Sequence, residues 1–212
     1  MFYNEIEHLF LLLEGIMEHI EIVPLSVERT EDYLAFFETG MAAASDEWGY
    51  RCYCVCFCSK DNRSEQGFEN ADVRREGAIR YIKEGVLTGY LAYADGQVVG
   101  WCNANDRNAC LDCYGMHIYC GADTLAADSE QVKSVFCFEI APSMRKKGVA
   151  TALLRRVMAD AKQDGYACVE AYPEKEAMGD AANYSGPKAF YEKMGFEQYG
   201  ETEQHLILRK RL

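Results

Sequence analysis

A run of cations followed by a glycine separates two apolar segments in the second half of the chain. The residues Arg145-Lys146-Lys147-Gly148-Val149-Ala150-Thr151 combine three adjacent positive charges with a glycine and a small alanine. Gly148 has no Cβ, so a ligand can approach the backbone closely at this point. If a helix begins here, its first N–H groups are unpaired and its dipole favours negative charge. These residue types predict a site for a pyrophosphate, and the alternative is a solvated loop that only opens a helix.

Two elements must position this loop. Residues 135–140 form a short, apolar, β-prone run that Ala141-Pro142 closes, which predicts a buried strand. After the loop, apolar residues recur at helical spacing as far as Gly165. These residues are Ala150, Leu153, Leu154, Val157, Met158 and Ala161. We therefore expect a strand, a basic loop and an amphipathic helix in succession.

This arrangement resembles the acetyl-CoA-binding motif of the GNAT acetyltransferase superfamily, which reads Gln/Arg-x-x-Gly-x-Gly/Ala between a strand and a long helix. Arg145, Gly148 and Ala150 fill its defined positions. A second stretch, Phe190 to Phe196, resembles the family's Phe/Leu-Tyr-x-x-x-Gly-Phe helix, with Tyr191 as the tyrosine. The resemblance implies an α/β (α+β) chain with the GNAT fold, in which a mixed central β-sheet is splayed between its fourth and fifth strands and flanked by helices.

The resemblance also implies how acetyl-CoA binds as co-substrate. In the family, the fourth strand separates from the next at a bulge, so its free backbone groups pair with the pantetheine like an added strand. Here these groups belong to Phe138, Glu139 and Ile140, and residues 145–151 hold the pyrophosphate. Many members add an asparagine seven residues before the tyrosine, where this chain has Tyr184, so a contact from Asn183 is the corresponding expectation.

Acetyl transfer to an amine needs an acid and a base. The coenzyme A thiolate needs a donor as it leaves, and the resemblance gives this role to Tyr191, whose alternative role is to cover the core. The amine must also lose a proton before it attacks the thioester. Glu139 is the nearest candidate base, with Glu170 behind it. Family members place the base differently, and in histone-type members the position falls near Ser134.

The chain has 212 residues and a formal net charge of −12. We expect an N-terminal extension over residues 1–16, helical in spacing, that packs on the body or on a second copy of the chain in a homodimer. Residues 17–212 then form the acetyltransferase domain. The acidity disfavours a nucleic acid or an anionic membrane as partner and favours a cationic small molecule. The alternative is that acidity only keeps the protein in solution.

Ten cysteines raise the question of metal or disulfide chemistry. Cys52, Cys54, Cys56 and Cys58 alternate, so in a strand all four would point to one face, where they could not surround one tetrahedral ion. We therefore expect reduced, mostly buried thiols and no metal, with metal or redox use as the alternative. The short apolar run at residues 9–13 has neither the basic segment before it nor the small-residue cleavage site of a secretory signal. We therefore expect a cytoplasmic protein.

Other patterns complete the predicted fold. Residues 19–25 alternate as a first strand, residues 26–37 and 73–86 have helical spacing, and Asp95-Gly96 joins two strands in a hairpin. A strand is expected around residues 116–119, another at 167–172, a helix at 188–194, and a closing hairpin after it. Residues 41–72 are assigned to the acceptor side by resemblance, and Trp48 is either part of that pocket or a core aromatic.

The resulting prediction is an N-acetyltransferase that moves an acetyl group from acetyl-CoA to a primary amine of a small cationic acceptor, by direct attack in a ternary complex. The alternative is a non-catalytic module of the same shape that binds acetyl-CoA and regulates.

Overall fold

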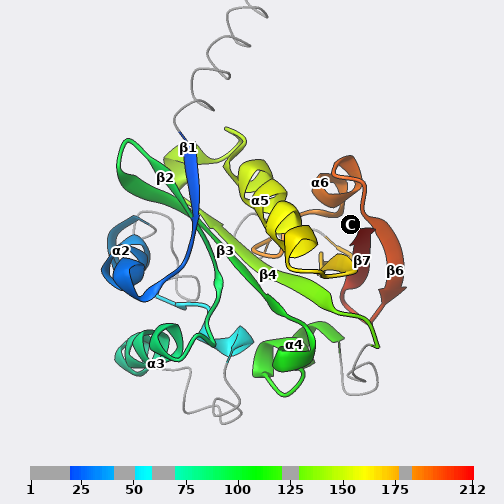
Figure 1. The fold of residues 1–212 in the computed structure, drawn as a ribbon, viewed down its shortest axis with the longest axis horizontal. Helices are drawn as coiled ribbons and strands as arrows, with labels where there is room; N and C mark the ends of the chain where they lie inside the picture. The colour runs from blue at the N-terminus through cyan, green and yellow to red at the C-terminus, as the bar shows by residue number, and fades with distance from the viewer. Residues whose placement is uncertain (1–19, 41–50, 59–69, 121–128, 177–182) are drawn as a thin grey trace, which may run out of the picture.

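A seven-stranded sheet forms the centre of the molecule (Figure 1). The computed structural model describes residues 20–40, 51–58, 70–120, 129–176 and 183–212. The strand order is β1-β2-β3-β4-β5-β7-β6. The strands are β1 (Ile20–Pro24), β2 (Gly89–Ala94), β3 (Gln97–Asp106), β4 (Val132–Ile140), β5 (Cys168–Ala171), β6 (Glu197–Glu201) and β7 (Leu206–Arg211). Among these strands only β4 and β5 pair in parallel, and the sheet is mixed as predicted.

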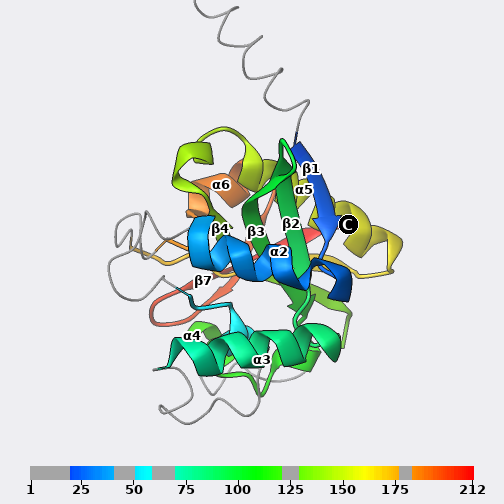
Figure 2. The same ribbon diagram turned by 90° about the vertical axis from the view of Figure 1, so that its left-hand side faces the viewer.

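Helices cover both faces of the sheet. They are α2 (Thr30–Ala35), α3 (Ala71–Lys83), α4 (Tyr114–Cys120), α5 (Val149–Gln163) and α6 (Lys188–Lys193). The apolar stripe of α5 buries Leu153, Leu154 and Val157 against β1 to β5. Tyr33 of α2, Ile82 of α3 and Met116 of α4 belong to a second core cluster, which also contains Trp101 of β3. Figure 2 shows α2 and α3 running side by side in that part of the molecule.

The β2–β3 hairpin has the predicted turn. Asp95 and Gly96 both adopt left-handed backbone conformations, with φ of 49° and 75°. Two consecutive residues of this kind match the twist of the flanking strands, which is why Asp-Gly is favoured there.

The predicted splay between β4 and β5 is confirmed. The two strands pair only from Val132 opposite Cys168 to Val135 opposite Ala171. On its other side β4 stays paired with β3, but Asn103 lies opposite Cys137 and Ala104 opposite Val135. Phe136 is therefore an extra residue, a β-bulge at the point where β5 departs. The bulge places Phe136 and Cys137 on the face opposite α5, whereas Phe138 packs on the α5 side.

Two sequence predictions are wrong. The cysteine run is not a strand, because Tyr53 and Cys54 adopt left-handed conformations and Val55–Phe57 form a single 3-10 turn. The strand expected near Met116 is the helix α4, whose buried face packs into the core. The predicted N-terminal extension and Trp48 lie outside the described residues. In the described part of the chain, no helix has the length and apolar character needed to cross a membrane.

Candidate active site

The open edge of β4 leads directly into the cationic loop. Beyond the bulge, residues 136–140 have no β5 partner, and the chain then passes through the 3-10 turn Pro142–Met144 to Arg145. Arg145 remains attached to this edge, because its Nε donates to the Ile140 carbonyl over 3.3 Å. The predicted backbone site and the predicted pyrophosphate site are thus adjacent along one continuous segment.

The start of α5 has the geometry of an anion site. Gly148 precedes the helix with φ of 85°, a conformation that costs other residues free energy. The first bond of the helix runs from the Ala152 N–H to the Gly148 carbonyl, so the N–H groups of residues 149–151 precede the hydrogen-bonded ladder. Gly148, the residue at the N-cap position, has no side chain that could cap them. Arg145 and Lys146 are exposed beside this helix end, and Lys147 is half-buried.

Glu139 lies on the splayed part of β4. Its neighbours Phe138 and Ile140 pack toward α5, so the Glu139 side chain lies on the opposite face with Cys137, whose Sγ is 4.0 Å from Glu139 Oε1. Burial raises the pKa of Glu139 to about 7, and the positive charge of Arg145 opposes this shift only in part. A carboxylate that titrates near neutral pH can take up and release a proton at the working pH of an enzyme.

Tyr191 lies within α6 and is fully buried. Its hydroxyl donates to the Ser185 carbonyl over 2.6 Å, and its ring packs edge-on against Phe190 and Phe196. Burial raises its pKa well above the usual tyrosine range, so the hydroxyl keeps its proton. In this structure the Tyr191 hydroxyl is protonated and its proton is hydrogen-bonded to the Ser185 carbonyl. Its role as donor to a thiolate stays a prediction.

Tyr184 and Tyr119 form hydrogen bonds with backbone groups on the open edge of β4. The sequence analysis assigned a function to neither residue. The Tyr184 carbonyl accepts from the Phe138 N–H over 2.7 Å, and the Tyr119 hydroxyl donates to the Phe136 carbonyl over 2.7 Å. The two tyrosine hydroxyls also bond to each other. Asn183, the expected cofactor contact, lies just before Tyr184, and its carbonyl accepts from the Gly186 N–H over 3.1 Å. A contact between Asn183 and the cofactor stays a prediction.

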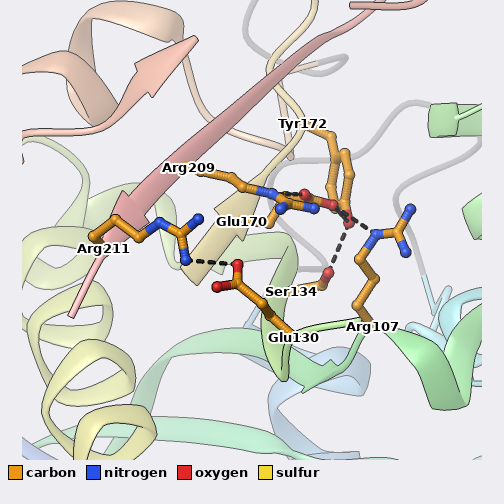
Figure 3. Close-up of polar contacts among 7 residues, drawn as sticks. All are labelled: Arg107, Glu130, Ser134, Glu170, Tyr172, Arg209 and Arg211. Carbon is orange, nitrogen blue, oxygen red and sulfur yellow. Dashed lines mark hydrogen bonds and ion pairs between the residues drawn. The ribbon is translucent and has the colours of Figure 1, made fainter. Parts of the chain in front are cut away.

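Glu170, the second carboxylate considered as a base, lies in a buried ionic network (Figure 3). Arg107 donates to one of its oxygens and Arg209 to the other, and the Tyr172 hydroxyl adds a third bond. Because the single Tyr172 proton goes to Glu170, the Ser134 hydroxyl is the donor in the 2.7 Å bond between Ser134 and Tyr172. This network joins β4, β5 and β7, and its side chains are buried. Three donors already engage the Glu170 carboxylate, so we assign it a structural role.

The described cysteines are free thiols, and most of them are buried, with Cys52 and Cys56 partly buried. A chain of thiol hydrogen bonds links Cys52 to Cys54 and Cys54 to Cys137, beside Glu139. Burial raises the pKa of Cys58 to about 12, which makes its thiol a poor metal ligand at neutral pH. No group of metal-binding side chains occurs in the described ranges.

Sequence reasoning missed one cysteine pair. Cys110 and Cys113 have the C-x-x-C spacing that a scan for paired cysteines finds directly. Their thiols are hydrogen-bonded, and both side chains are buried. The hydrogen bond and burial raise the pKa of Cys110, so the pair has the properties of core thiols.

Comparisons with known proteins agree with this geometry. The acetyltransferase (GNAT) family profile matches residues 57–196, well over half of the chain. The chain therefore belongs to the GNAT family of acetyltransferases. A search of curated proteins gives no match.

Solved structures show the same fold at low sequence identity. An N-acetyltransferase from Staphylococcus aureus Mu50 has a TM-score of 0.51 and 15% identity, covering 91% of this chain and 98% of its own. PaiA N-acetyltransferase from Thermoplasma acidophilum, in complex with coenzyme A, has a TM-score of 0.51, 16% identity and coverages of 91% and 99%. The GNAT domain of S. lividans PAT has a TM-score of 0.53, 19% identity and coverages of 91% and 90%.

Proposed function

We propose that the protein binds acetyl-CoA along the open edge of β4 and transfers the acetyl group to a primary amine of a small cationic acceptor. The observation that carries this proposal is the continuity of the splayed edge with the cationic start of α5. A strand edge can pair with the amides of a pantetheine, and a helix start flanked by three cations can hold a pyrophosphate. The coenzyme A bound in the PaiA structure supports the choice of cofactor.

Glu139 is the proposed base. It lies on the splayed strand, and its pKa of about 7 allows it to accept a proton from the ammonium group of the acceptor, directly or through water, which leaves the free amine as the nucleophile. Tyr191 is the proposed donor to the departing thiolate. Attack by the free amine on the thioester carbonyl gives a tetrahedral intermediate whose nitrogen still carries one surplus proton. Its collapse breaks the C–S bond, the departing coenzyme A thiolate takes the proton of Tyr191, and the surplus proton of the nitrogen passes to the Tyr191 oxygen, directly or through water.

Calorimetric titration with acetyl-CoA tests the binding site. Gly148→Asp places a carboxylate where the helix N–H groups face the phosphates, and Gly148→Asn adds almost the same volume without charge. Both residues tolerate the left-handed conformation comparably. We expect Gly148→Asp to weaken binding at least about tenfold and Gly148→Asn to have a much smaller effect. Equal affinities for the folded parent and Gly148→Asp would exclude this loop as the pyrophosphate site.

A panel of amines tests the reaction. Release of free coenzyme A with a diamine or another cationic amine, beyond the rate without acceptor, is the expected result. Detection of the acetylated amine by mass spectrometry confirms transfer rather than thioester hydrolysis. Binding of acetyl-CoA without turnover on any amine would favour a non-catalytic binding role.

A further inference from the structure

The proposed reaction uses two hydrogen-bond donors, a backbone N–H of β4 and the Tyr191 hydroxyl. In this structure both donate to backbone carbonyls of two consecutive residues. The Phe138 N–H donates to the Tyr184 carbonyl over 2.7 Å, and the Tyr191 hydroxyl donates to the Ser185 carbonyl over 2.6 Å. A thioester offers acceptors of the same kind, namely its carbonyl oxygen and, as the acetyl group leaves, its sulfur. The segment Tyr184–Gly186 therefore lies where the thioester would make the same bonds.

This segment is anchored at each end. The Tyr184 hydroxyl bonds to the Tyr119 hydroxyl, which itself donates to the Phe136 carbonyl; because Tyr119 has one proton, Tyr184 is the donor of the bond between them. At the other end Gly186 has φ of 79°, and a Cβ there would lie 3.3 Å from the Tyr191 ring. A glycine at this position lets the turn close against the phenol.

The closed arrangement leaves one polar group unpaired. The Ser185 side chain is 1% exposed, and its Oγ has no hydrogen-bond partner among the described residues. A buried hydroxyl without a partner costs free energy, and water can pair with it once the segment moves. The unpaired Ser185 hydroxyl therefore favours movement of the segment away from Phe138 and Tyr191. The hydrogen bond between Tyr184 and Tyr119 opposes this movement.

We propose that Tyr184–Gly186 is an internal cap of the thioester site, which acetyl-CoA displaces from Phe138 and Tyr191 when it binds. The inference rests on the proposed function, since it assigns the displaced bonds to that same site. It adds a conformational equilibrium to the reaction: only the open form binds the thioester, so the closed fraction lowers the apparent affinity.

Two substitutions shift this equilibrium in opposite directions. Tyr184→Phe removes the hydroxyl that ties the cap to Tyr119 and keeps the ring, so acetyl-CoA should bind about 2- to 10-fold more tightly. Ser185→Ala removes the unpaired hydroxyl, so the closed form gains: acetyl-CoA should bind about 2- to 10-fold more weakly, while Tm rises. Tyr199→Phe, on an exposed ring in β6, is the matched control and should change neither quantity.

The opposite signs separate a cap from a merely structural segment. Damage to a structural segment lowers the affinity and Tm together, and would do so in both variants. Affinities that change in the same direction, or by less than twofold in both variants, overturn the cap. Failure of the parent to bind acetyl-CoA at all refutes the proposed function instead.

The parent protein gives an independent test if a variant does not fold. With ¹⁵N-labelled phenylalanine the amide spectrum contains at most ten signals, since the chain has ten phenylalanines, and Phe138→Leu identifies the signal of Phe138. Saturation with acetyl-CoA should shift this signal strongly, because its acceptor changes from the Tyr184 carbonyl to the thioester. A Phe138 signal that stays in place while acetyl-CoA saturates the protein overturns the proposal.

Discussion

Burial raises the pKa of the Glu139 carboxyl to about 7, so this side chain exchanges between its protonated and ionised forms near neutral pH. A base acts in its ionised form. The proposed reaction should therefore slow as the pH falls below 7 and reach a plateau above about pH 8. For kcat/KM, this acid limb reports the pKa of the free enzyme.

Glu139→Gln tests this assignment, since it keeps the shape of the side chain and removes the ionisable group. We expect kcat/KM for the amine to fall by about 10²–10⁴ and the limb near pH 7 to disappear. Glu130→Gln, at an exposed carboxylate that pairs with Arg211, is the control and should retain the parent profile. A Glu139→Gln profile that still shows the acid limb would assign it to another group.

Tyr191 should affect catalysis and binding in different ways. Tyr191→Phe removes the hydroxyl that would protonate the thiolate, so kcat should fall by about 10² or more. The same change also releases the Ser185 carbonyl, so acetyl-CoA should bind as tightly as to the parent or more tightly. Single-turnover measurements show whether chemistry limits the rate. A folded variant with weaker binding and an unchanged single-turnover rate would mean that Tyr191 only packs the core.

The ionic network between β4, β5 and β7 should contribute to stability rather than to catalysis. Glu170→Gln leaves Arg107 and Arg209 buried without the carboxylate between them. Removing one member of a buried ion pair costs about 3–5 kcal/mol, so the free energy of unfolding in urea should fall by about this amount. Glu130→Gln breaks the exposed pair with Arg211 and should leave the midpoint unchanged. A stable Glu170→Gln protein with greatly reduced kcat would instead place Glu170 in the reaction.

Local patterns explain which elements could be predicted from the sequence. The segment β4, loop and α5 was predicted correctly because its strand, glycine and helix periodicity all lie within about thirty residues. The Asp95-Gly96 hairpin was likewise predicted, since its turn depends on two residues. In each case the residues that determine the structure are neighbours in the chain.

The rest depends on contacts between distant residues. The alternation of Cys52 to Cys58 indicated a strand, but Trp101 Nε1 donates to Cys54 Sγ over 3.3 Å, within a left-handed turn that no local pattern signals. Tyr119 was placed in an expected strand and no role was assigned to it. Its importance comes from a bond to the Phe136 carbonyl, which exists only because a bulge leaves that group unpaired by β3 and β5.

At the scale of the whole molecule, the net charge is −12, whereas the loop proposed to hold the pyrophosphate carries three adjacent cations. A negative molecule attracts cations over distances comparable to the Debye length, about 10 Å at 0.1 M salt, so it concentrates a cationic acceptor near its surface. The local charges of Arg145, Lys146 and Lys147 oppose this field where the pyrophosphate is proposed to bind. Cofactor and acceptor would thus be attracted by different parts of one charge distribution.

Salt dependence can decide whether the acidity serves the acceptor or only keeps the protein in solution. We expect kcat/KM for a diamine to fall about tenfold between roughly 20 and 500 mM salt, because screening removes the long-range attraction. The matched acceptor is an amino alcohol of equal length, which replaces the second ammonium group with a neutral hydroxyl and should have a clearly smaller salt slope. All rates are measured with acetyl-CoA at saturation at each salt concentration, so that weaker cofactor binding does not contribute. Equal slopes for the two acceptors would contradict a preference for cations and would leave the net charge with a role in solubility alone.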